Sequence, residues 1–209
     1  LVDFETGLGT GVNLSVTGGT FDAGQQADFY TAEPLPGTDA FAVFDGKLDA
    51  LGTISYQQIA PPEGNLVLTL DSLDPGQSYE IVLYGHRGDY LLENRAALLT
   101  LTGADAFANE STAGSDFSGP DDPSTRMGPD NVEGYVARWT GVRAGSDGTV
   151  EIVVSYDGTV PGDEYKGKYA NALALFEEGA GAVKFAAFGD YGYTPSPGLG
   201  EVADLVNAH

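Results

Sequence analysis

The sequence is poor in the residues that are typical of disulfide-bonded or redox-active proteins. It contains no cysteine, one methionine, one tryptophan and two histidines in 209 residues. Without cysteine, no disulfide stabilises the fold, and cysteine usage gives no information on the redox compartment. His86 and His209 are too few to complete a two-metal hydrolytic site, which needs several His, Asp and Asn ligands.

Basic residues are also scarce. Nine Lys and Arg residues stand against 31 Asp and Glu residues, which gives a formal net charge of −22. Such a surface repels nucleic acid and anionic membranes, and both are therefore excluded as partners. The same surface suits high salt or attracts divalent cations.

Long hydrophobic runs are missing as well. No stretch approaches the ~20 apolar residues of a membrane span, and no signal-peptide pattern stands at Leu1. Since the first residue is not Met, we expect a processed or excised product.

The residues that are present favour many short strands. Hydrophobic residues make up 42% of the chain, which supports a real core, and 30 glycines favour frequent turns. More than eight short apolar runs separated by turn signals predict a mainly β protein, an antiparallel β-sandwich of jelly-roll type. The expected strands are 1–5, 12–17, 28–32, 40–44, 53–59, 65–70, 79–84, 96–102, 134–142, 149–156 and 168–177. Residues 103–131 are expected to be a long polar loop.

Two patterns indicate which side chains face the core. Leu66, Leu68 and Leu70 alternate along one run and should share one face of a strand. The turn before Tyr79 resembles the tyrosine corner of fibronectin-type sandwiches, in which the hydroxyl bonds to nearby backbone. Trp139 shares a strand face with Tyr135 and Ala137 and is expected to be buried.

Residues 1–178 resemble the galactose-binding-like sandwich modules of secreted bacterial proteins. The resemblance is carried by Trp139–Val142, the turn Asp147–Val150 and the strand Tyr169–Leu175. It implies a secreted, extracellular or cell-surface protein. It also implies that residues 168–176 return beside residues 2–5.

The same resemblance implies a structural calcium ion and a sugar site, for which several residues are candidates. Calcium binds six to eight oxygens, which Asp3, Glu5 and Asn171 would supply at the paired ends, or Asp157, Asp163 and Glu164 in a late loop. The alternative is that these carboxylates are solvated, as most are in an acidic chain. Contact with a polysaccharide or cell-surface glycan would use aromatic rings. The candidate rings are Tyr90, Tyr165 and Tyr169.

The end of the chain carries a different motif. Residues 183–192 form an apolar run that ends with Asp190 between two glycines, and residues 199–206 follow with helical spacing. This arrangement resembles the opening motif of calcineurin-like metallophosphoesterases of the purple-acid-phosphatase-like branch. The resemblance implies that Asp190 ligates one metal of a two-metal centre that hydrolyses phosphate esters.

The two resemblances imply a division of the chain. Residues 1–178 are expected to form the sandwich, residues 179–182 a hinge, and residues 183–209 a short β-α fragment of an α/β domain. The remaining motifs of a phosphoesterase would follow later in a longer protein, so we expect no catalytic residue in this chain.

Three functions remain open at this point. The first is a non-catalytic sandwich that positions or targets a secreted metallophosphoesterase. The second is a carbohydrate-binding or adhesion module in which residues 183–209 are a tail. The third is a structural surface or filament subunit that self-assembles through its sheet edges.

Overall fold

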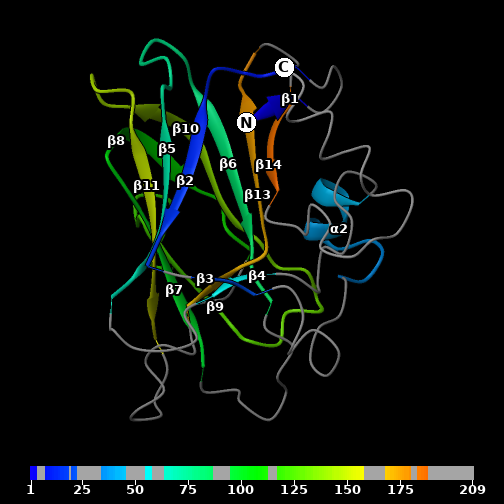
Figure 1. Cartoon of the computed structure of the whole chain (residues 1–209). Coiled ribbons are helices and arrows are strands. Elements are labelled where there is room, and N and C mark those ends of the chain that lie inside the picture. Colours follow the sequence, from blue (N-terminus) through cyan, green and yellow to red (C-terminus); the bar gives the residue numbers. More distant parts are fainter. Residues whose placement is uncertain are drawn as a thin grey trace.

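Two antiparallel β-sheets dominate the protein (Figure 1). The computed structural model describes residues 1–3, 8–18, 20–22, 34–45, 55–57, 64–86, 95–112, 117–157, 168–179 and 183–187. All strand pairings within this part of the chain are antiparallel. The prediction of a mainly β, antiparallel sandwich is therefore confirmed.

The first sheet has the strand order β1-β14-β13-β6-β10-β8 and the second has the order β2-β5-β11-β7-β9. The strands of the first sheet are β1 (Val2–Asp3), β14 (Val183–Ala187), β13 (Ala172–Glu177), β6 (Tyr79–Tyr84), β10 (Ala137–Ala144) and β8 (Ala104–Asn109). Those of the second are β2 (Asn13–Thr17), β5 (Leu66–Asp71), β11 (Val150–Tyr156), β7 (Ala97–Thr102) and β9 (Ser124–Met127). A small third sheet, β12 (Tyr169–Ala170), β4 (Ser55–Gln57) and β3 (Thr20–Asp22), lies at one end of the sandwich (Figure 1).

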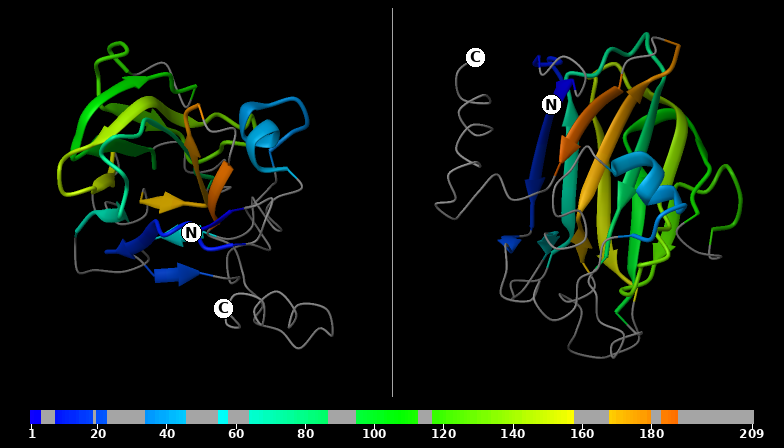
Figure 2. Two further views of the ribbon diagram at one scale, coloured as in Figure 1. Left: turned by 90° about the horizontal axis from the view of Figure 1, so that it is seen from above. Right: turned by 90° about the vertical axis from the view of Figure 1, so that its right-hand side faces the viewer.

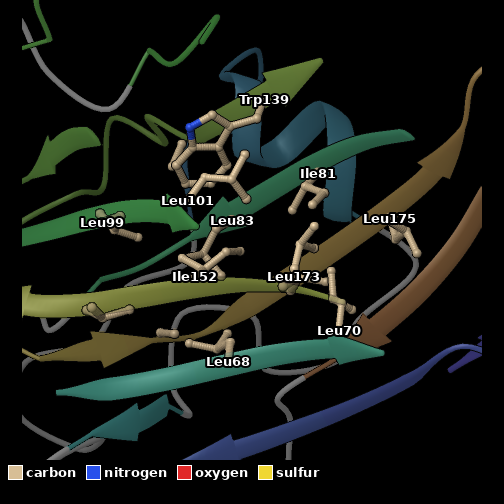
Figure 3. Packing of buried hydrophobic residues seen from close by; sticks show 14 of the residues in the cluster. Leu68, Leu70, Ile81, Leu83, Leu99, Leu101, Trp139, Ile152, Leu173 and Leu175 are labelled. Carbon is tan, nitrogen blue, oxygen red and sulfur yellow. The ribbon is translucent and has the colours of Figure 1, made fainter. Parts of the chain in front are cut away.

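The main core lies between the two large sheets. Leucine and isoleucine side chains of β5, β7 and β11 meet those of β6 and β13 and the Trp139 side chain of β10 (Figure 3). Leu66, Leu68 and Leu70 are buried on one face of β5, as their alternation predicts. Trp139 is fully buried in the same cluster, and its indole Nε1 donates a hydrogen bond to the Pro123 carbonyl over 3.1 Å.

The turn before β6 is a tyrosine corner, as predicted. The Asp74 backbone N–H donates to the Tyr79 hydroxyl oxygen over 2.9 Å. Burial, above all, raises the pKa of the Tyr79 phenol. The hydroxyl thus fixes the turn that connects β5 and β6 across the two sheets.

A second cluster covers the outer face of the first sheet. Residues expected as a strand at 40–44 form a short helix instead, α2 (Asp39–Phe44), which packs against β6 and β13 (Figure 2). The prediction was wrong because Ala40, Val43 and Phe44 follow the helical spacing i, i+3, i+4, and Thr38 caps the helix by accepting from the Phe41 N–H. This helix lets β6 be buried on both faces, with Val82 and Tyr84 against α2.

The segment 103–131 was predicted to be a loop, and this was also wrong. It contains β8 and β9, which form outer strands of the two sheets. These strands are short, and their outward faces are polar or small, so the sequence shows little apolar alternation there. The two segments form strands because β8 pairs with β10 and β9 pairs with β7, which the sequence pattern alone does not indicate.

The strand at 183–187 also differs from its expected role. It was expected to open a parallel α/β sheet after a hinge, but β14 pairs antiparallel with β13 and with β1 inside the sandwich. Val2 lies opposite Phe185, and Phe185 lies opposite Ala174. Within the described residues, β13 therefore does not pair with β1, because β14 lies between them.

One buried hydroxyl in the core has no hydrogen-bond partner within the described residues. Thr125 Oγ1 is on β9, opposite Leu99, in a fully buried position. We expect Thr125→Val to raise the free energy of unfolding by about 1 kcal/mol, because an unsatisfied polar group is replaced by a methyl of similar shape. Urea unfolding followed by circular dichroism measures this difference.

Thr100→Val is the matched control for that substitution. Thr100 lies on the neighbouring strand, but its hydroxyl is 2.9 Å from Ser124 Oγ. This variant should lose about 0.5–1 kcal/mol with its hydrogen bond. Equal destabilisation by both substitutions would show that the Thr125 hydroxyl is hydrogen-bonded after all.

Candidate functional site

The most extensive group of buried polar side chains lies where β6 ends. His86 and Asn131 are 1% and 2% exposed, although neither is an apolar residue. The Asn131 backbone N–H donates to His86 Nδ1 over 2.8 Å. Because a ring nitrogen that accepts an N–H carries no proton, the neutral imidazole holds its proton on Nε2.

The Asn131 side chain satisfies three backbone groups. Its Nδ2 donates to the Gly85 carbonyl and to the Tyr135 carbonyl, both over 2.9 Å. Its Oδ1 accepts from the Tyr135 N–H over 2.9 Å. The Asn131 amide therefore joins the end of β6 to the turn at 131–135. It also bonds to both the N–H and the carbonyl of Tyr135.

Asn171 plays the equivalent role at the start of β13. Its Oδ1 accepts from the His86 N–H over 2.6 Å, and its own N–H donates to the Tyr84 carbonyl over 2.9 Å. The Tyr84 hydroxyl donates to the Asn131 carbonyl over 3.2 Å, and its ring stacks on that of His86 at a centroid distance of 6.5 Å. We refer to Tyr84, His86, Asn131 and Asn171 as the His86 network.

The His86 network is suited to holding backbone segments. Its amides and its imidazole Nδ1 bond to main-chain N–H and C=O groups of β6, β13 and the turn at 131–135. A nucleophile or a general base needs a polar atom directed at substrate. The hydrogen bonds of the network instead satisfy backbone groups that would be costly to bury without a partner.

The first predicted calcium group is not brought together. Asp3 lies opposite Lys184, which lies opposite Leu175, and Leu175 is four residues beyond Asn171. Asp3 and Asn171 are thus separated by about 13 Å along the strands, in addition to two strand spacings. Asn171 is also buried, and its side chain is bonded to the His86 backbone. Glu5 lies outside the described residues.

The second predicted calcium group is described only in part. Asp157 follows β11 and forms an ion pair with Arg126, in which Nε and Oδ2 are 2.9 Å apart. Asp163 and Glu164 lie outside the described residues. Within the residues that the structure describes, no group of three or more His, Cys, Asp or Glu side chains is placed to hold a metal ion.

One of the three predicted glycan-contacting tyrosines is described, and for that one the prediction was wrong. Tyr169 is fully buried, and its hydroxyl donates to the Met127 carbonyl over 3.2 Å. Its position at a strand end suggested exposure, but β12 pairs with β4 and the ring enters the main core. Tyr90 and Tyr165 lie outside the described residues, as does the predicted metal ligand Asp190.

Two exposed carboxylates stabilise turns. Asp122 accepts from the Ser118 hydroxyl over 2.6 Å and from the backbone N–H of Ser118 and Ser124. These bonds, the one from the Ser118 hydroxyl first, lower the pKa of Asp122. The pKa of Asp71 is lowered in the same way, chiefly by the bond from the Asn13 amide. Asp122 thus organises the local backbone, whereas Asp71 joins the end of β5 to β2 through the Asn13 amide.

Sequence reasoning missed the connection between His86 and Asn131. The two residues are 45 positions apart, and no spacing rule connects them. The one available signal was the polarity of Asn131 and His86 next to apolar strands, which is also typical of exposed turns. That both side chains are buried is visible only in the structure.

No protein-family model, no curated protein and no solved structure matches this chain. Among the described residues, no helix is long and apolar enough to cross a membrane.

Proposed function

We propose that this chain is a non-catalytic β-sandwich module of a secreted metal-dependent phosphoesterase, which it positions or targets. The observation that supports this best is the use of the buried polar side chains in the described sandwich. His86, Asn109, Asn131 and Asn171 are each bonded to main-chain groups. Such side chains stabilise a scaffold.

The phosphoesterase part of the proposal rests on the motif around Asp190. The residues Phe188-Gly189-Asp190-Tyr191-Gly192 directly follow β14 in the sequence. By resemblance, Asp190 would be one ligand of a two-metal centre, and such a centre activates water for attack on a phosphate ester. The other ligands would come from other parts of the longer protein.

The proposal predicts that this chain alone does not hydrolyse phosphate esters. Purified protein incubated with p-nitrophenyl phosphate and Mn²⁺, Zn²⁺ or Fe³⁺ should give the same release of nitrophenol as metal in buffer, because one carboxylate cannot assemble a two-metal site. The assay is run in parallel on Asp190→Asn.

Turnover by the wild type that Asp190→Asn abolishes would contradict a non-catalytic module. The phosphoesterase link has a separate test in the coding sequence that follows His209. We expect it to encode further His, Asn and Asp motifs of the two-metal type, and a reading frame without them would remove that link.

A further inference from the structure

We propose that Tyr135 and Leu35 form a fixed docking surface for an arginine- or lysine-bearing segment of a partner protein. We call these two residues, with the segments 34–38 and 131–135 that carry them, the Tyr135 platform. The platform requires no phosphoesterase chemistry and stands independently of that proposal.

Both side chains are exposed although they are large and apolar. Tyr135 is 47% exposed and Leu35 is 52% exposed. They belong to segments almost 100 residues apart in the sequence that contact each other directly. The Leu35 N–H donates to the Val132 carbonyl over 3.1 Å, and the Ala40 N–H donates to the Gly134 carbonyl over 2.9 Å. Leu35 and Tyr135 thus occupy adjoining turns on the outer side of the first sheet.

The backbone of the platform is fixed by hydrogen bonds to the buried side chains of Asn131 and His86. Asn131 holds both the N–H and the carbonyl of Tyr135, and His86 Nδ1 in turn accepts the Asn131 N–H. Gly134 adopts φ +65°, and a Cβ atom there would lie 2.2 Å from Thr38 Oγ1, so only glycine permits this contact. Because the Tyr135 backbone is fixed, a partner that binds the ring orders only the side-chain torsions of this residue.

The charged residues in the two chain segments that carry the platform are all negative. The segments 34–45 and 128–136 contain Asp39, Asp45, Asp130 and Glu133 and no Lys or Arg. All four carboxylates are exposed, and none forms an ion pair within the part of the chain that the structure describes. Arg126, by contrast, is paired with Asp157.

This combination fits a cationic side chain. A guanidinium or ammonium group over the face of a tyrosine ring is attracted by the ring quadrupole. Its aliphatic stem can pack on Leu35, while carboxylates such as Glu133 attract the charge. The same carboxylates repel phosphates, nucleic acid and acidic polysaccharides. The complementary partner is therefore a basic protein segment.

A short basic peptide tests the platform directly. The probe is a rhodamine-labelled peptide of four arginines alternating with glycines, and binding to the full chain is measured by fluorescence anisotropy. We expect Tyr135→Ala to weaken binding about threefold or more, because it removes the ring without changing the net charge. Tyr135→Phe keeps the ring and should bind like the wild type. Thermal unfolding confirms that each variant is folded.

Matched charge variants separate the platform from the general acidity of the protein. Glu133→Gln and Asp105→Asn each remove one exposed carboxylate, but Asp105 lies on β8, outside the platform. We expect the first to weaken peptide binding more than the second. Equal effects of the two, or unchanged binding by Tyr135→Ala, would overturn the proposal. A neutral oligosaccharide that binds in a Tyr135-dependent manner while the peptide does not would assign the surface to sugars instead and would also overturn it.

Discussion

Replacing Trp139 with alanine is expected to lower the free energy of unfolding by about 3–5 kcal/mol, the largest effect expected of a single side-chain truncation among the described residues. Trp139 is the largest of the fully buried side chains and lies on β10 between β6 and β8. Truncation leaves a cavity between the sheets, and the surrounding strands cannot collapse into it without breaking their pairing. It also leaves the Pro123 carbonyl without its donor. Urea unfolding followed by circular dichroism measures the loss.

Trp139→Phe separates the two causes of that loss. Phenylalanine keeps much of the apolar volume but cannot donate to Pro123, so this variant should lose clearly less stability than Trp139→Ala. Tyr135→Ala is the surface control, because its ring is half exposed and its removal creates no cavity. A small effect of Trp139→Ala, within about 1 kcal/mol, would contradict the burial of the indole in the core.

Asn131→Asp is expected to lower the free energy of unfolding by about 3–5 kcal/mol at pH 7, although the two side chains have nearly the same shape. The substitution removes the two donor contacts to Gly85 and Tyr135 and places a carboxylate oxygen against their carbonyl oxygens. Burial raises the pKa of the introduced carboxyl above its unfolded value. The charged form is therefore the destabilised form, and the stability lost relative to the wild type should become smaller as the pH falls toward 4 and the carboxyl is protonated.

Asp130→Asn is the control for that variant. Asp130 is the preceding residue, and it is exposed, so the isosteric exchange should change stability by no more than about 0.5 kcal/mol. Urea unfolding of both variants at pH 7 and pH 4 provides the comparison. If Asn131→Asp were as mild as Asp130→Asn, the Asn131 amide would not be holding the turn at 131–135.

The His86 network and the Tyr135 platform are connected by this single amide. A variant that loosens the turn at 131–135 should also weaken the binding of a basic peptide, because the Asn131 amide bonds to both polar groups of the Tyr135 backbone. The hydrogen bonds of the His86 network explain why the polar side chains of His86 and Asn131 are buried. At the surface, these bonds fix the backbone that carries the exposed Tyr135 ring.

Strand patterns and the core were predictable where one local rule decided the outcome. The alternation of Leu66, Leu68 and Leu70 fixed one face of β5, and the turn before Tyr79 fixed the tyrosine corner. The apolar neighbours of Trp139 indicated its burial. In each case, residues close together in the sequence contained the relevant physical information.

The candidate sites were less predictable because exposure is not a local property. Tyr169 and Asn171 stand at a strand end, where side chains are often accessible, but the Tyr169 ring lies in the main core and the Asn171 amide is bonded to the His86 backbone. Tyr135 was expected to share the buried strand face of Trp139, yet it precedes the first residue of β10 and is half exposed. Which side chain a neighbouring element covers depends on pairings across tens of residues.

The sequence by itself determined the class of this protein, an antiparallel β-sandwich with a strongly negative surface, because period-two alternation and net charge are properties of the chain alone. Only the tertiary structure decided that residues 39–44 form a helix over the first sheet, that residues 183–187 enter that sheet between β1 and β13, and that His86 meets Asn131. The physical reason is the same in all three cases. A short apolar segment suits either a helix or a strand, and a polar side chain suits either water or a buried backbone partner, so the distant segments that pack against each one select between them.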